Sequence, residues 1–204
     1  TQKPLEEEQI QLFFSDIEPL ATSKVLVLLE NETLSIGERV LAQELQLTVR
    51  GQDKIGIIGP NGVGKSTLLG KLQQLLSDKS EISLGFMPQD YQETLQLDLS
   101  PVEFLSQTGH KEELQKIQSF LASLNFSYPE LHHQIRSLSG GQQGKLLLVN
   151  LVLRKPNFLI LDEPTRNFSP TSQPEIRKLF ATYPGGLITV SHDRRFLKEV
   201  CRSI

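Results

Sequence analysis

The sequence predicts an α/β domain, because short apolar runs typical of buried strands alternate with longer stretches of helical periodicity. Three of these runs end in polar loops. Residues 55–58 lead into a glycine-rich loop, residues 158–161 end in two carboxylates, and residues 187–190 end in a serine and a histidine. Since ligands of open α/β sheets bind at the carboxyl ends of the strands, these loops are the expected place for a binding site.

The composition fits one globular domain with a sizeable core and room for a small subdomain. The chain has 204 residues, of which 38% are hydrophobic and 22% are charged, as in ordinary globular proteins. No apolar run approaches the roughly 20 residues that span a bilayer, and no basic-then-apolar signal segment is found. Any membrane part of the system is therefore expected on another chain.

The cysteine content and the net charge limit which cellular compartment and which partners are plausible for this chain. A single cysteine, Cys201, excludes an internal disulfide and suits a reducing, cytoplasmic location. The net charge of −3 gives no general attraction for nucleic acid. This argues against a free-standing RNA binder, but it leaves open a domain that is docked by other parts of a larger protein.

The N-terminal part predicts connecting chain followed by antiparallel strands. Residues 1–23 are polar and acidic at first, and we interpret them as a linker or interdomain segment that is ordered only if the apolar cluster at residues 12–14 docks. Residues 25–29 and 45–49 have strand patterns, and residues 50–53 are a turn into the next strand.

The loop after residue 58 carries the pattern G-x-x-x-x-G-K-[ST] between a strand and a helix, the setting in which this pattern binds phosphates. Its glycines let backbone N–H groups point inward, and the following helix adds the positive end of its dipole. Lys65 would reach the β- and γ-phosphates, and the Ser66 hydroxyl would bind Mg²⁺. The residues predicted to bind a nucleoside triphosphate are Gly59, Pro60, Asn61, Gly62, Val63, Gly64, Lys65, Ser66 and Thr67.

Helical patterns fill the middle of the chain. Pro101 is expected at the first position of a helix. Leucine and isoleucine recur at helical spacing over residues 114–124, with charged side chains on the opposite, solvated face. We predict a small helical subdomain at about residues 91–140.

The C-terminal third predicts further helices around the two later strands. Residues 142–153, residues 174 to about 180, and residues 194–200 have helical patterns. Residues 183–186 form a turn that is rich in proline and glycine.

A second pattern narrows the family. The run L-S-G-G-Q at residues 138–142 ends twenty residues before Asp162 and Glu163. Taken alone, Ser139 could be an ordinary helix N-cap. In this order and spacing behind a phosphate loop, the chain resembles the ATP-binding cassette (ABC) ATPases. The resemblance runs from about residue 25 to the end, so residues 24–204 are expected to form the nucleotide-binding domain.

The resemblance implies a composite site for ATP and Mg²⁺. Asp162 would hold Mg²⁺ through water, and Glu163 would be the general base that orients and polarises the attacking water. A second cassette would supply the rest, so that two cassettes close around two nucleotides and reopen on hydrolysis. The residues that would bind the γ-phosphate of the partner's nucleotide are Ser139, Gly140 and Gly141, with Gln142 completing their motif.

Two single residues also match the family. Gln89 follows a strand predicted at residues 82–86 and matches the glutamine that contacts Mg²⁺ and the lytic water. His192 follows the strand at residues 187–190 and matches the histidine that contacts the γ-phosphate. The other histidines are interpreted as loop or surface residues: His110, His132 and His133.

Details of two loops favour one branch of the family. The stretch from Asp162 to Pro170 and the S-H-D-R-x-F-L motif that begins at Ser191 look like the ABC-F branch. Its members carry two cassettes in one chain without a membrane domain, and several act on the ribosome or in antibiotic resistance. This chain would then be a second cassette. Because it stops twelve residues after His192, we expect it to belong to a longer protein.

Other classes remain open. One alternative is the ATPase subunit of a membrane transporter. A chromosome-maintenance or repair ATPase is less favoured, since no coiled-coil heptads interrupt the cassette. A binding module in which ATP acts only as a conformational ligand is a further alternative, although Glu163, Gln89 and His192 argue against it.

The sequence departs from the family pattern at two positions. Ser169 stands where the family has an aspartate that helps couple the two sites. Ile36 matches the aromatic residue on which the family stacks adenine, so an apolar contact is expected and the choice between ATP and GTP stays open. We interpret Arg166, Arg194 and Arg195 as surface charges rather than as contacts to a partner's phosphates.

Overall fold

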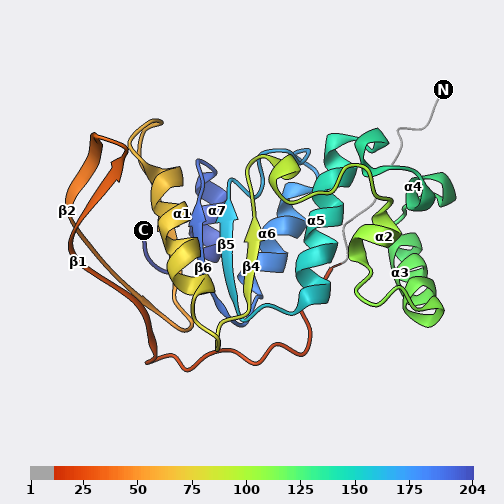
Figure 1. Ribbon diagram of the computed structural model, residues 1–204, viewed down its shortest axis with the longest axis horizontal. Helices are drawn as coiled ribbons and strands as arrows, with labels where there is room; N and C mark the ends of the chain where they lie inside the picture. Colours follow the sequence, from red (N-terminus) through yellow and green to blue (C-terminus); the bar gives the residue numbers. More distant parts are fainter. Residues whose placement is uncertain (1–11) are drawn as a thin grey trace.

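The computed structural model describes residues 12–204 (Figure 1). Its centre is a four-stranded parallel sheet in the order β3-β6-β5-β4. The strands are β3 (Lys54–Ile57), β4 (Leu84–Met87), β5 (Phe158–Asp162) and β6 (Gly186–Val190). The α/β prediction is therefore confirmed.

Helices cover both faces of this sheet, which is why its strands read as unbroken apolar runs. The helix α1 (Lys65–Ser77) packs on one face with Phe158 and Ile160 of β5. The opposite face, with Leu159 and Leu161, packs against the second helical layer. That layer contains α5 (Gly140–Arg154), α6 (Gln173–Ala181) and α7 (Arg194–Val200).

The strand β4 is displaced from the predicted residues 82–86. Ile82 is buried but lies outside the strand, and Met87 lies inside it. The reason is pairing, because β4 forms its ladder only where β5 runs beside it, from the Leu84–Phe158 pair to the Met87–Leu161 pair.

An antiparallel hairpin flanks α1, as Figure 1 shows in red and orange. It consists of β1 (Val25–Ile36) and β2 (Arg39–Arg50), and both strands are much longer than the predicted residues 25–29 and 45–49. The extension was not visible because Asn31 and Glu44 adopt positive φ angles of 54° and interrupt the alternating pattern with register shifts. The turn at residues 50–53 is confirmed.

Short helices lie between β4 and α5. They are the 3₁₀ turns η1 (Tyr91–Glu93) and η2 (Ile135–Ser137), and the helices α2 (Pro101–Leu105), α3 (Lys111–Ser123) and α4 (Tyr128–His132). Pro101 is the first residue of α2, as predicted, and Ser100 forms a capping box with Glu103. The charged face of α3 is solvent-exposed while Ile117 and Leu121 are buried.

The described part of the predicted linker, residues 12–23, runs along the domain. Leu12 is buried, and the Phe14 ring lies 4.8 Å from the Tyr183 ring between centroids. The Gln52 side-chain amide donates a hydrogen bond of 2.7 Å to the Leu20 carbonyl. The acidic run of the predicted linker, at residues 6–8, lies outside the described residues.

A buried cation, Lys54, holds the first parallel strand to α6. Its Nζ donates to the carbonyls of Phe180 and Ala181, at 3.3 and 3.1 Å. Burial, with a smaller contribution from the nearby Arg202 charge, lowers the Lys54 pKa to about 8. An unfolded lysine titrates near 10.5, so between about pH 8 and 10.5 the unfolded chain binds more protons than the folded chain.

Because the unfolded chain binds more protons in this pH range, the stability of the folded protein should depend on pH. As the pH rises from 8 to 10, the free energy of unfolding of the wild type should increase relative to that of Lys54→Met by about 1 kcal/mol per pH unit. Urea denaturation followed by circular dichroism at each pH measures the difference. A difference that stays constant or falls with pH would contradict the assignment.

Candidate active site

The phosphate-loop pattern lies between β3 and α1, as predicted. Gly59, Gly62 and Gly64 have φ angles of 152°, 81° and 101°, a backbone that L side chains rarely adopt. A Cβ added to Gly64 would also lie 2.9 Å from the Leu41 side chain of β2. The hairpin therefore packs directly on the end of the loop, and glycine is required there for two reasons.

Lys65, the first residue of α1, turns back over this loop. Its Nζ donates to the Gly59 carbonyl and lies 3.4 Å from His192 Nε2. The lysine thus connects the loop after β3 with the loop after β6. A cation in this position can meet the phosphates that a loop of this geometry accepts.

Two carboxylates lie at the end of β5: Asp162 is its last residue and Glu163 follows it. Burial raises the Asp162 pKa above its usual value, and the charge of the neighbouring Glu163 raises it further. Lys65 and Arg166 oppose this shift in part. A cation bound beside Asp162 would relieve the repulsion, as metal ions do in such sites.

Glu163 is fixed by both its backbone and its side chain. It adopts a φ of 49°, which is uncommon for a residue other than glycine and is typical of functional sites. Its N–H donates to the Val190 carbonyl at 2.8 Å. Its Oε2 accepts from the His192 backbone N–H at 3.2 Å, and its Oε1 lies 3.4 Å from His192 Nε2. The carboxylate therefore points across the sheet edge from β5 toward β6.

His192 is the meeting point of the three loops. Besides Lys65 and Glu163, its Nε2 contacts the Asn61 side-chain oxygen at 3.2 Å. The ring remains 56% exposed, so a ligand in the cleft can reach it. A single imidazole nitrogen on the loop after β6 thus faces groups that follow β3 and β5.

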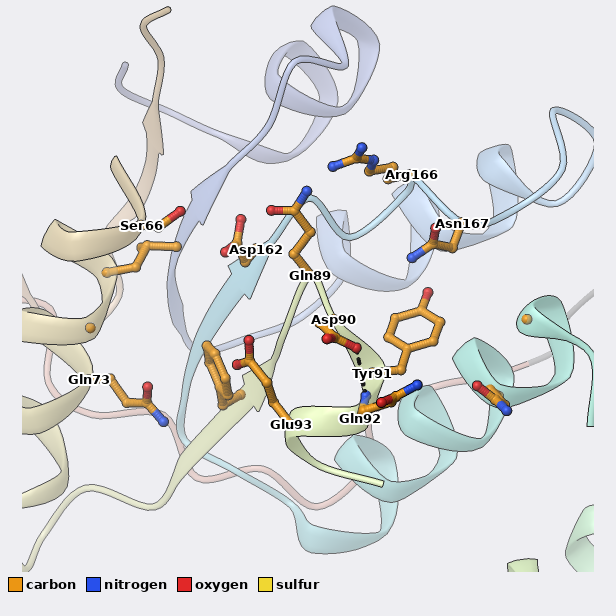
Figure 2. Close-up of a pocket in the computed structure, with 15 residues that line it drawn as sticks. Ser66, Gln73, Gln89, Asp90, Tyr91, Gln92, Glu93, Asp162, Arg166 and Asn167 are labelled. Atoms are coloured by element: carbon orange, nitrogen blue, oxygen red, sulfur yellow. Dashed lines mark hydrogen bonds between the residues drawn. The ribbon is translucent and has the colours of Figure 1, made fainter. Parts of the chain in front are cut away.

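Two adjoining cavities lie at this edge. The smaller, of about 410 Å³, brings together seven predicted residues: Asn61, Lys65, Ser66, Gln89, Asp162, Glu163 and His192. The larger, of about 780 Å³, lies between α1, the segment after β4 and the start of α5. Figure 2 shows that Ser66, Gln89, Asp162 and Arg166 converge on it, and these four residues line both cavities.

This donor set suits Mg²⁺. Magnesium prefers oxygen ligands, takes one or two from protein and completes its shell with waters and phosphate oxygens. Ser66, Gln89 and Asp162 all line the smaller cavity and offer such oxygens. Within residues 12–204 no group of three or more histidine, cysteine or acidic side chains is placed to hold a metal by itself.

Other predicted residues lie outside the smaller cavity. Ile36 ends β1 beside the hairpin turn and is 59% exposed. Ser139 is the N-cap of α5, where its hydroxyl accepts from the Gln142 N–H at 3.2 Å. Of the L-S-G-G-Q run, Gly140 alone lines the larger cavity. His110, His132 and His133 are exposed, as expected.

The structure adds residues that the sequence analysis missed. The Thr165 hydroxyl donates to Asp193 at 3.0 Å, and Asp193 also caps α7 by accepting from Arg195 and Phe196. An N-cap pattern before the predicted helix at residues 194–200 could have indicated Asp193. Gln173, which donates to the carbonyl of Thr165 at 3.3 Å, gave no sequence signal.

The comparisons with known proteins agree with this geometry. The family model described as "ABC transporter" matches residues 42–166. This chain belongs to the ABC family. Cassettes of this family are ATPases, so the chain is an ATPase cassette that binds ATP.

Among curated relatives, the cassette is similar to the ATP-binding protein YheS of Escherichia coli K12, at 31% identity over 91% of this chain and 30% of that protein. It is also similar to ABC transporter F family member 2 of Arabidopsis thaliana, at 28% identity over 100% of this chain and 31% of that protein. The chain thus spans about a third of the length of the curated relatives it matches.

Among solved structures, the cassette resembles the dimeric, post-hydrolysis state of the ATP-binding cassette MJ0796 bound to ADP and Pi. The TM-score is 0.69 at 20% identity, over 86% of this chain and 91% of that one. A bacterial Atm1-family ABC exporter with ATP bound gives a TM-score of 0.66 at 17% identity, over 91% of this chain and 38% of that one. These likenesses establish the cassette fold.

The position of Lys65 predicts that it dominates nucleotide affinity. Lys65→Ala should raise the ATP dissociation constant by about 10-fold or more, because charge-assisted hydrogen bonds to phosphate contribute about 1.5–3 kcal/mol. Isothermal titration calorimetry measures the change. The matched control is Lys71→Ala on the same helix, where the lysine pairs with Glu32 at 3.0 Å instead of facing the cavity. Equal affinities of the two variants would contradict the role of Lys65.

Proposed function

We propose that this cassette binds Mg-ATP at the edge formed by β3, β5 and β6 and hydrolyses it when a second cassette closes over the nucleotide. One observation carries the proposal. The Glu163 carboxylate is held by the His192 backbone and faces a cavity that also contains Lys65 and Asp162. A fixed base beside a phosphate-binding lysine is the arrangement that water attack on a γ-phosphate requires.

Each residue has a separate task in this proposal. Lys65 binds the β- and γ-phosphates, and His192 contacts the γ-phosphate. Glu163 orients the attacking water and accepts its proton, while Gln89 helps to orient the same water. Ser66, Gln89 and Asp162 would hold Mg²⁺, directly or through water, and the bound ion would neutralise charge on the phosphates.

The proposal requires a partner because the smaller cavity lacks part of the predicted site. Ser139, Gly141 and Gln142 do not line the cavity that contains Lys65 and Glu163. They stand at the start of α5, beyond the segment that begins at Tyr91. We propose that residues from about 91 to 140 act as a helical subdomain that presents Ser139 to the nucleotide of a second cassette.

We favour the ABC-F branch for the longer protein. Curated relatives include a protein named as a member of ABC transporter family F, and this chain covers about a third of its length. In this reading the chain is one of two cassettes in a cytoplasmic protein that acts on the ribosome. No helix within residues 12–204 is long and apolar enough to cross a membrane. The alternative is the ATPase subunit of a membrane transporter.

Two departures from the family shape the proposal. The Ser169 hydroxyl lies 3.1 Å from the hydroxyls of Thr171 and Ser172, so it engages its own loop. We propose that coupling between the two sites is weaker here than in cassettes with an aspartate. Ile36 supplies one apolar contact to the base, which would leave discrimination between ATP and GTP low.

The decisive variant is Glu163→Gln, which keeps the shape of the side chain and removes its basicity. Turnover should fall by about 100-fold or more, while ATP binding persists and the closed pair accumulates. Phosphate release and ATP titration measure the two properties separately. Glu112→Gln, on the exposed face of α3, is the matched control. Wild-type turnover by Glu163→Gln would contradict the proposed base.

The branch assignment predicts ribosome binding. The longer protein, carrying Glu163→Gln and the equivalent change in its other cassette, should co-migrate with ribosomes in a sucrose gradient when ATP is present. Omitting ATP should abolish co-migration, because the cassettes then stay open. If the protein binds ATP and still stays out of the ribosome peak, the transporter alternative gains support.

A further inference from the structure

Three segments of the cassette meet at one tyrosine, Tyr91. It opens η1, the turn that follows Gln89, and it is 8% exposed. Its ring lies against α5 and against the loop at residues 165–169 that follows Glu163 (Figure 2). The proposed function places three residues around the nucleotide: Gln89, Ser139 and Glu163. Along the sequence, each of them lies within five residues of a residue that takes part in this contact.

The contact with α5 is made possible by Gly144. A Cβ at this position would lie 2.7 Å from the Tyr91 Oη and 2.7 Å from the Phe168 ring. Both separations are far below van der Waals contact, so any larger residue would displace one of the two rings. Glycine is among the least favourable residues in a helix interior. Its presence in the middle of α5 therefore reflects the close approach of Tyr91 and Phe168.

The contact with the loop after β5 is a hydrogen bond. The Asn167 side chain bonds the Tyr91 hydroxyl, and the two groups face each other in Figure 2. Burial raises the pKa of the Tyr91 phenol, and the bond from Asn167 opposes that rise in part. The hydroxyl therefore stays neutral. The same loop is held from below by the Gln173 amide, which donates to the Phe168 carbonyl at 3.1 Å.

The turn that carries Tyr91 is held by local hydrogen bonds. The Asp90 side chain accepts from the Gln92 N–H at 3.0 Å and caps the turn. The Tyr91 carbonyl accepts from the Leu95 N–H at 2.9 Å. Only Asp90, the N-cap of this turn, separates Gln89 from Tyr91, so the two residues are closely linked along the chain.

We infer that Tyr91 is a positioning residue for hydrolysis, which joins the Gln89 segment, the loop after Glu163 and helix α5 through its hydroxyl bond to Asn167 and its packing on Gly144. This inference rests on the proposed function, because it assumes that Gln89, Glu163 and Ser139 act on nucleotides. When Ser139 engages the nucleotide of a second cassette, α5 moves as a rigid helix. Tyr91 then shifts with α5 and positions Gln89 and the loop that contains Asn167 at the same time. In this role Tyr91 acts through Gln89 and Asn167 and not on the nucleotide itself.

The test is Tyr91→Phe in the intact protein that contains this chain. The change removes the hydroxyl and keeps the ring, so the packing on α5 is retained. We expect kcat to fall by about fivefold, with KM for ATP and Tm close to the wild-type values, because one hydrogen bond is lost at the positioning step. Tyr128→Phe is the matched control, since that tyrosine is 76% exposed on α4.

A double-mutant cycle isolates the bond. Asn167→Ala should lower kcat by a similar factor, and the double variant Tyr91→Phe with Asn167→Ala should be no slower than either single variant. The inference would be overturned if the losses in kcat of the two single variants multiplied in the double variant. It would also be overturned if Tyr91→Phe had the same kcat as Tyr128→Phe, or if Tyr91→Phe raised KM at constant kcat. Glu163→Gln, measured in parallel, keeps the outcomes distinct: if Glu163→Gln is inactive and Tyr91→Phe is normal, the proposed function stands and only this inference fails.

Discussion

The site depends on one constraint: β3, β6 and β5 run parallel and side by side, so their carboxyl ends fall at a single edge of the sheet. Lys65, His192 and Glu163 follow these three strands and meet there although they are far apart in sequence. The strands hold this register because both faces are buried, by α1 on one side and by the second helical layer on the other. The geometry of the proposed site thus follows from packing.

Polar contacts then fix the loops that the packing brings together. The Glu163 N–H bonds the Val190 carbonyl, and the Asp193 carboxylate bonds Thr165 while it caps α7. These bonds join the loops after β5 and β6 without using the Glu163 carboxylate, the Lys65 amine or the His192 ring. If Glu163 acts as the proposed base, it needs little rearrangement when a nucleotide arrives, which is the condition for effective electrostatic catalysis.

Much of this arrangement is readable from the sequence because it is local. The ends of β3, β5 and β6, the phosphate loop and the helix at residues 194–200 each depend on a short pattern, and the structure places them within one residue of the prediction. The length of the hairpin was not readable, because positive φ angles at Asn31 and Glu44 interrupt its alternation. The burial of Lys54 was not readable either, since its partners at the end of α6 lie more than 120 residues away. The roles assigned to Ser139 and Ile36 remain predictions.

The features that the sequence did not predict depend on contacts between segments that are distant along the chain. Tyr91, Gly144 and Asn167 have no common motif, and their association emerges only when β4, α5 and the loop after β5 are assembled. The role of Ser139 is hard to predict for a different reason, because the group that it is proposed to bind belongs to another cassette. A single chain can therefore fix the position of Ser139 without containing its ligand.

In the proposed mechanism this cassette holds half of each hydrolytic site. The most direct test is a structure of the intact protein that carries Glu163→Gln and contains Mg-ATP. We expect the γ-phosphate bound by Lys65 to be covered by the serine–glycine–glycine motif of a second cassette, while Ser139 faces the nucleotide of that cassette. A nucleotide whose γ-phosphate is contacted by Ser139 of the same chain, or is left open to solvent in the closed protein, would contradict it.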